Sequence, residues 1–226
     1  MGHSRRKAPM NQPAKAIRDE PRWPPALAII AVLGLLAVLP DHVQLMPVWV
    51  SYVAALAVLV PMIAVTFSPA SILWLRIERM AVILLAAGYV AIAAAELADM
   101  IGIITLRPAE ARSISLLSSS VAVWVINVLM FSLLYWQIDR GGPHARMSRT
   151  SAEPDWLFPQ AAAPTSPDWR PWFLDYLFVA YNTAVAFSPA DVLPLTRRAK
   201  MLMMLESVIS FLTIVVVAAR AVGVLQ

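Results

Sequence analysis

Cysteine is absent from this chain of 226 residues, and glycine occurs only seven times. The lack of cysteine excludes disulfides, thiolate metal sites and cysteine nucleophiles. The three histidines (His3, His42 and His144) lie far apart, and neither GxGxxG nor GxxxxGK[ST] occurs. No Ser/His/Asp set can be assembled on one helix face. The sequence therefore predicts no cofactor, no metal site and no enzyme.

Charged residues are also scarce, because they make up 14% of the chain while 60% is apolar or aromatic. A typical soluble domain has about 25% charged residues. This composition excludes a disordered chain, a coiled coil and an ordinary cytosolic enzyme, and indicates a polytopic membrane protein. The net charge of +4 then indicates cytoplasmic loops that contact anionic lipid, so the expected partner is the bilayer and not nucleic acid.

Six hydrophobic runs follow a polar, basic, proline-rich stretch over residues 1–25, which we expect to be a disordered cytoplasmic tail. A transmembrane helix needs about 20 apolar residues, so the longer runs predict spans. The predicted fold is all-α, a polytopic membrane helix bundle over residues 26–226. A basic start before a short apolar run also fits a signal peptide, although no small-x-small cleavage site follows. The runs cover residues 26–39, 48–67, 80–104, 114–138, 172–187 and 201–222.

Lysine and arginine are distributed unevenly among the connections between these runs. If all six runs cross the membrane and the N-terminus is cytoplasmic, thirteen of the eighteen basic residues lie inside. If the fifth run (172–187) is re-entrant and returns to the side it came from, fifteen lie inside. Both arrangements obey the positive-inside rule. The charges therefore predict a cytoplasmic N-terminus and a cytoplasmic loop over 139–171, but leave five or six crossings open.

A short motif occurs twice at an offset of 120 residues, as AVTFSPA over 64–70 and AVAFSPA over 184–190. Each copy stands before another apolar run, where Ser is a good N-cap and Pro suits the first helical position. Two interpretations remain open. With six crossings, the surrounding hairpins would be inverted repeats of the kind that transporters use. Alternatively, Ser-Pro is simply a good turn between helices.

Ionisable residues inside a span are costly, and they are therefore the first candidates for function. Glu96 and Asp99 lie three residues apart, which places them on one helix face, and Glu206 lies early in the last run. These three acids could form a site for a cation or a proton, or lie hydrated or paired at the interface. Asn182 and Thr183 help to make the fifth run the most polar, which fits a segment that lines a cavity.

Other polar and small residues predict packing. Asn127, in the middle of the 114–138 run, is expected to make an interhelical hydrogen bond, not a substrate contact. Ala87, Ala91 and Ala95 form a stripe of small side chains that suits close helix contact. In the 139–171 loop, the stretch 156–160 (WLFPQ) is apolar enough to dip into the interface.

The segment 175–206 resembles the pore loop and inner helix of potassium channels. The stretch 191–196 (DVLPLT) is similar to the aspartate-x-x-proline-x-threonine pattern that follows the filter of that family. Glu206 falls where an acidic inner-helix residue often occurs. The glycines of the filter are replaced by Ser188 and Ala190 and its aromatic by Pro189, so the resemblance does not extend to potassium selectivity.

The second half also resembles a group of uncharacterised bacterial multi-pass membrane proteins. This resemblance implies a bacterial cytoplasmic (inner) membrane protein and supplies no activity. The residues that carry it are Tyr135-Trp136, Asp139-Arg140-Gly141-Gly142-Pro143, Phe158-Pro159-Gln160, Phe187-Ser188-Pro189, Asp191, Pro194-Leu195-Thr196 and Ala219-Arg220-Ala221-Val222.

Together these patterns favour a small transport or ion-permeation protein built around the third, fifth and sixth runs. The alternative is a non-conducting membrane scaffold or accessory subunit that binds a partner protein through the basic tail and the 139–171 loop. Association with further copies of the chain or with another membrane protein is left open. The residues expected to carry permeation are Glu96, Asp99, Asn182, Thr183, Asp191 and Glu206.

Overall fold

The computed structural model describes residues 20–38, 48–67, 72–106, 114–147, 152–162, 169–186 and 191–225. Helices dominate these ranges, which confirms the all-α prediction. Their order is α1 (Trp23–Val38), α2 (Val48–Phe67), α3 (Ile72–Leu106), α4 (Ile114–Ile138), the 3-10 turn η3 (Asp139–Gly141), α5 (Pro143–Met147), β1 (Trp156–Leu157), α6 (Pro159–Ala162), α7 (Phe173–Ala186), β2 (Leu193–Pro194) and α8 (Arg197–Leu225).

Two helices coincide with predicted runs, whereas α1, α3 and α8 begin three, eight and four residues before theirs. α2 and α4 have the predicted bounds, whereas α3 starts eight residues before its run. Its first turns contain the charged residues Arg76, Glu78 and Arg79. These are good helix formers, but a hydrophobic run identified by hydropathy leaves them out. α1 begins at Trp23, inside the stretch expected to be a disordered tail. Its prolines lie in the first turn of the helix, where no intrahelical amide donor is needed.

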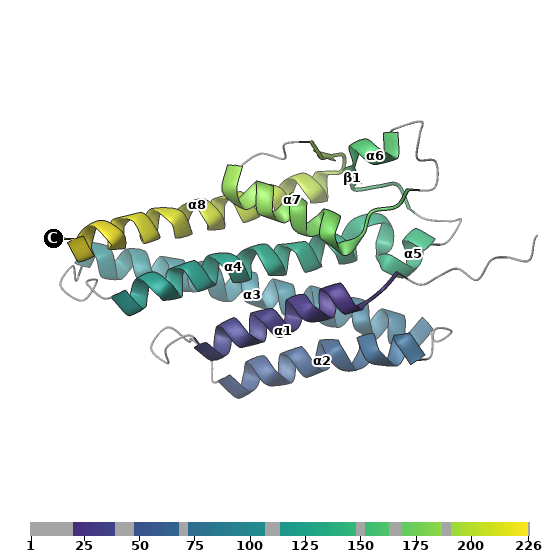
Figure 1. Ribbon diagram of the computed structural model, residues 1–226, viewed down its shortest axis with the longest axis horizontal. Coiled ribbons are helices and arrows are strands. Elements are labelled where there is room, and N and C mark those ends of the chain that lie inside the picture. The colour runs from purple at the N-terminus through teal and green to yellow at the C-terminus, as the bar shows by residue number, and fades with distance from the viewer. Residues whose placement is uncertain are drawn as a thin grey trace, which may run out of the picture.

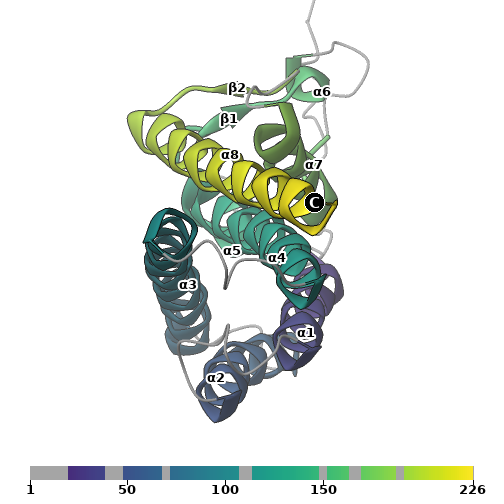
Figure 2. The same ribbon diagram turned by 90° about the vertical axis from the view of Figure 1, so that its left-hand side faces the viewer.

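The long helices run side by side along the long axis of the molecule (Figure 1). α1 to α4 follow one another around one half of the bundle, and α7 and α8 pack on the other side of α4 (Figure 2). α4 is the central helix, because it contacts α1, α3, α7 and α8. Its second half supplies several of the largest buried side chains, among them Phe131, Tyr135 and Trp136.

Three of the described helices are long and apolar enough to cross a membrane. These segments are Leu73–Ala95 in α3, Val121–Gly141 in α4 and Arg197–Ala218 in α8. Shorter apolar stretches occur in α1 (Trp23–Ala37) and α2 (Ala55–Val65). A membrane-embedded protein is thus supported, while six crossings are not established.

α7 differs from its long neighbours in length. Its 14 residues extend about 21 Å at 1.5 Å per residue, short of the roughly 30 Å of a bilayer core. α7 and α8 both begin at the end of the bundle where α4 finishes (Figure 1). Within the described residues, this is the geometry of the re-entrant alternative, in which the chain returns to the side from which α7 started.

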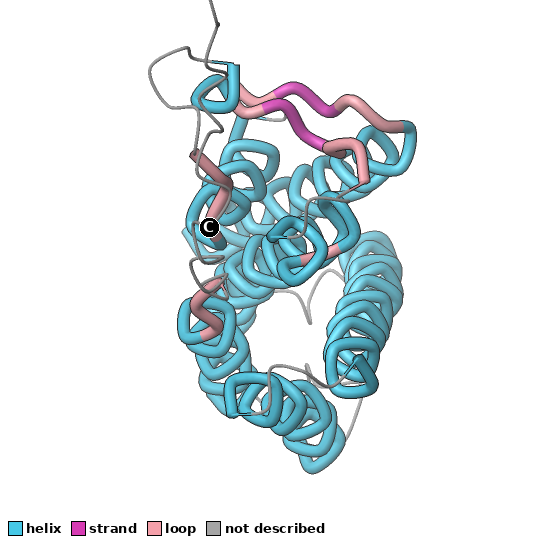
Figure 3. Tube along the Cα trace, turned by 90° about the vertical axis from the view of Figure 1, so that its right-hand side faces the viewer, coloured by secondary structure: helices cyan, strands magenta, loops and turns pink. Residues whose placement is uncertain are grey.

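The end at which α7 and α8 begin carries the remaining secondary structure of the described residues. Trp156 pairs with Pro194, and Leu157 with Leu193, in a two-residue antiparallel ladder. Figure 3 looks onto this end, with both strands near the viewer. The predicted loop over 139–171 is thus folded against the bundle over its described parts, and its Trp156 and Phe158 are buried. We call the described residues 139–147 and 152–162 the cap.

A glycine pair makes the sharp turn between α4 and the cap. Gly141 and Gly142 have φ of +85° and +103°, a region that other residues rarely adopt. A Cβ atom at Gly142 would lie 3.1 Å from the backbone oxygen of Gln137. This turn directs the chain back across the end of the bundle.

The lack of native cysteine makes the path of the chain through the membrane easy to test. We expect cysteines at Glu153 and Asp191, both exposed at the capped end, to react with a membrane-impermeant maleimide from one side. Labelling of E153C and D191C from opposite faces in oriented vesicles would contradict the re-entrant path and restore six crossings. The cysteine-free parent is the blank.

Candidate functional site

A row of buried polar side chains lies in the interface between α4 and α8. On α4, Asn127 and Tyr135 are eight residues apart, which is two turns along one face. On α8, Glu206, Ser210 and Thr213 share a face by their spacing of four and three. All five side chains are buried. The two rows face each other because α4 and α8 pack together along their lengths.

Glu206 is the acid of this row, and it has no accessible surface. The Tyr135 hydroxyl donates a hydrogen bond to Glu206 Oε2. Glu206 Oε1 has no hydrogen-bond partner among the described residues. No arginine, lysine or histidine in the described part of the chain forms an ion pair with Glu206. A buried carboxyl with one free oxygen is costly, and therefore a candidate for function.

One turn along α8 from Glu206, a second polar pair bridges the helices. Asn127 Nδ2 donates to Ser210 Oγ at 2.9 Å. The predicted interhelical hydrogen bond of Asn127 is thus confirmed. Asn127 Oδ1 lacks a partner among the described residues, as Glu206 Oε1 does. The α4–α8 interface therefore contains two buried oxygen atoms, Glu206 Oε1 and Asn127 Oδ1, that can each accept a hydrogen bond.

Aromatic rings from the cap close the row at its Glu206 end. The Trp156 ring lies 4.8 Å from the Tyr135 ring, centroid to centroid. Its Nε1 donates to the sulfur of Met203 on α8, at 3.2 Å. Trp156 also meets Tyr176 of α7 edge to face. The cap thus covers the polar row with side chains that have few polar atoms.

Around these rings, buried carboxylates join the cap to the bundle. Asp155 is fully buried and accepts hydrogen bonds from Arg198 Nε, at 2.5 Å, and Nη2, at 2.7 Å. Asp155 Oδ1 also accepts from the Thr196 hydroxyl at 2.6 Å. Arg198 and Thr196 stand at the start of α8, so Asp155 joins the cap to α8. Two-point binding of a carboxylate by arginine is strong and geometrically specific.

A second buried acid, Asp139, joins the cap to α7. Its Oδ1 accepts from the backbone N–H of Asp155, at 2.8 Å, and its Oδ2 accepts from the Tyr176 hydroxyl, at 2.6 Å. Burial raises the pKa of the Tyr176 phenol well above its ordinary value, while the nearby Arg146 guanidinium lowers it and Asp139 raises it. The Tyr176 hydroxyl is thus the donor that joins α7 to Asp139 of the cap.

The residues before α1 are held at the same end. Glu20 accepts from Arg146 Nη2 at 2.8 Å and from the Trp136 indole at 2.6 Å. Arg22 forms an ion pair with Glu78 of α3, with Nε and Oε1 3.2 Å apart. These contacts explain why Glu20 and Arg22 are buried, contrary to the expected disordered tail.

Among the described residues, no contacts bring the six predicted site residues together into one site. Glu96 and Asp99 lie in α3, but their side chains fall outside the described residues. On α7, Asn182 Nδ2 and Thr183 Oγ1 donate to carbonyl oxygens of their own helix. Both α7 side chains are thus occupied locally.

The last two predicted residues differ in their surroundings. Asp191 is exposed at the capped end of the bundle. Glu206 is buried and contacts another helix through a polar group, Tyr135.

Sequence reasoning overlooked the partners of Glu206 and the ionic groups of the cap. Tyr135 and Asp139 were noted only as parts of a family pattern, and Asp155 stood in a stretch expected to be a loop. No periodic signal marks them, because their partners are distant in the chain. The signal that was available is the tight turn after α4, which forces the following residues back onto the bundle.

Comparison with protein-family models, with curated proteins and with solved structures finds no match to this chain.

We expect D155N to destabilise the protein, because it removes the charge that two nitrogens of Arg198 bind. Loss of charge-assisted hydrogen bonds of this kind costs about 2 kcal/mol, which corresponds to a fall of roughly 4–8 °C in Tm at this chain length. Thermal unfolding of the purified protein in one detergent measures this fall in Tm. The matched control is E153Q, an exposed acid in the same segment, which should change Tm little. Equal shifts for the two variants would contradict a structural role for Asp155.

Proposed function

We propose that this is a small transport protein of the bacterial inner membrane in which the Glu206 carboxyl takes up and releases a proton during transport. The observation that carries the proposal is the fully buried Glu206 within the span Arg197–Ala218, hydrogen-bonded by Tyr135 at one oxygen and unpartnered, among described residues, at the other. Acids in such positions mark proton relays and ion pathways in membrane proteins.

A proton fits this site better than a metal cation. Hard cations are held by about six oxygen ligands or more, whereas a proton needs one acceptor atom. No group of three or more His, Cys, Asp or Glu side chains that could hold a metal ion occurs in the described part of the chain. Glu206 Oε1 supplies the single acceptor, and uptake of the proton neutralises the buried carboxylate.

Tyr135 has a positioning role in this proposal. Its hydroxyl binds Glu206 Oε2 and leaves Oε1 as the atom that exchanges the proton. The Phe131 and Trp156 rings, 5.9 Å and 4.8 Å from the Tyr135 ring between centroids, hold that ring in place. The exchange is a protonation equilibrium, in which the carboxylate gains a proton from one side and returns it to the other.

The second candidate function is a non-conducting scaffold or accessory subunit. It is favoured by the apolar side chains that α7 and α8 leave exposed, such as Phe178, Tyr181, Val208 and Phe211. These would meet lipid, a further copy of the chain or another membrane protein. A stoichiometric partner that co-purifies with the chain would favour this function, and a clean homo-oligomer would count against it.

We expect E206Q to abolish proton flux in proteoliposomes, because glutamine keeps the size and the hydrogen bond to Tyr135 but cannot exchange a proton. A trapped pH-sensitive dye measures the flux after a potassium-valinomycin potential is imposed. E153Q is the matched control, since it removes one exposed acid from the cap and should leave the flux unchanged. Y135F should reduce the flux without abolishing it, because the phenol only orients the carboxyl.

Two outcomes would overturn this function. Proteoliposomes of the parent protein that leak no faster than empty liposomes would exclude proton transport under these conditions and leave the scaffold. E206Q liposomes that leak as fast as the parent would place the pathway elsewhere. Equal amounts of folded protein, checked by gel filtration in detergent, are required for each comparison.

A further inference from the structure

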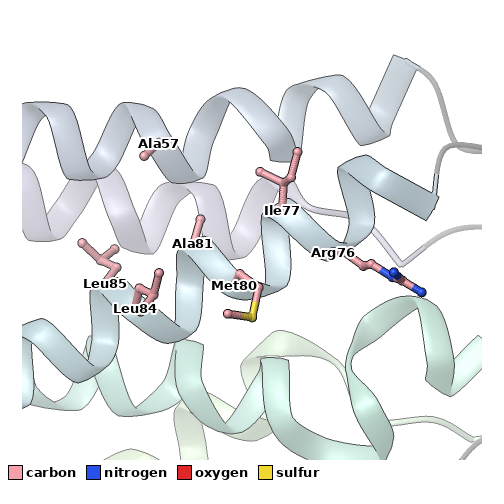
Figure 4. A pocket seen from close by; sticks show the side chains of 7 residues that line it. All are labelled: Ala57, Arg76, Ile77, Met80, Ala81, Leu84 and Leu85. Atoms are coloured by element: carbon pink, nitrogen blue, oxygen red, sulfur yellow. The ribbon is translucent and has the colours of Figure 1, made fainter.

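A groove on the surface between α2 and α3 has no role in the proton site. It has a volume of about 550 Å³ and is open along one side. Its walls are apolar except at one end, where Arg76 of α3 stands (Figure 4). The lining residues are Ala57 from α2, and Arg76, Ile77, Met80, Ala81, Leu84 and Leu85 from α3.

The groove runs along the axis of α3, which is the direction of a lipid acyl chain beside a membrane-spanning helix. Arg76 and Leu85 are nine residues apart on α3, which is about 13 Å along the helix axis. This stretch lies within the candidate span Leu73–Ala95, so the groove runs from the first turn of the span into its apolar part. Ile77, Met80 and Leu84 are exposed along it. An apolar chain laid there would cover these three side chains.

Arg76 gives the groove a charge preference at its outer end. Its side chain is exposed, and among the described residues it forms no ion pair. By contrast, the nearby Glu78 is buried and pairs with Arg22 on a different face of α3. Arg76 lies near the start of α3, at the capped end of the bundle (Figure 1). A guanidinium can bind a phosphate group through two parallel N–H donors, as arginine commonly does.

We infer that this groove binds one anionic phospholipid, with an acyl chain along Ile77, Met80 and Leu84 and the phosphodiester on Arg76. A membrane helix from a partner is a poorer match, because a groove closed at one end by an exposed arginine presents a charge to it. A small phosphate ion would use Arg76 but leave the apolar walls empty. The lipid alone satisfies both parts of the groove.

The experiment measures retained lipid by native mass spectrometry on the full chain in a neutral detergent. Phosphatidylglycerol and phosphatidylcholine of the same chain length are added in equal amounts. We expect the parent to retain phosphatidylglycerol preferentially, and R76Q to lose about tenfold in affinity for it. R197Q is the matched control, because Arg197 is also an exposed arginine at the capped end but does not line the groove.

A second variant tests the apolar part. A57F fills the groove from α2 and leaves Arg76 in place, so it should weaken retention of both lipids. Equal losses for R76Q and R197Q would show only a diffuse basic surface and overturn the inference, as would equal retention of the two lipids by the parent. Displacement of the lipid by millimolar inorganic phosphate, with A57F unchanged, would show a site for the ion alone. None of these results depends on proton flux, so this inference and the proposed function fail separately.

Discussion

The arrangement of the bundle depends on the cost of placing a charge away from water. Four acids at the capped end are buried, namely Glu20, Glu78, Asp139 and Asp155. Each of them is bound by an arginine, by a hydroxyl or by an amide N–H at hydrogen-bond distance. A buried charge without such partners would cost several kcal/mol. The paired acids therefore determine where the cap, the start of α8 and the residues before α1 can lie.

The buried acids at the capped end also explain why α7 and α8 begin at the same end of the bundle. After the cap, the chain returns to the bundle as α7, whose Tyr176 donates a hydrogen bond to Asp139. α8 starts at the same end, where Arg198 donates to Asp155. Both tethers belong to the cap, so α7 and α8 begin side by side (Figure 1). An arrangement that moved the start of α8 to the far end would break the Asp155–Arg198 pair and leave a buried carboxylate uncompensated.

Glu206 differs from the buried acids at the capped end in one respect. The acids of the cap are bound by cations or by several donors, whereas Glu206 has the Tyr135 hydroxyl and a free oxygen among the described residues. Its neighbours Tyr135 and Asn127 in the α4–α8 interface are neutral, so no cation among the described residues balances a negative charge on Glu206. The difference in partners is the physical reason to separate a structural set of acids from Glu206, the acid to which we assign the proposed transport role.

The sequence by itself determined the helical class, the bounds of α2 and α4, and the polar candidates Asn127 and Glu206, because hydropathy and residue spacing are local properties of the chain. It also limited the path of the chain to two alternatives, since basic residues collect on one side in both. It did not determine that residues 20–25 are ordered, that the cap folds onto the bundle, or that Tyr135 meets Glu206. Those features depend on pairs such as Glu20 with Arg146, 126 residues apart, whose attraction exists only after the helices have packed and excluded water.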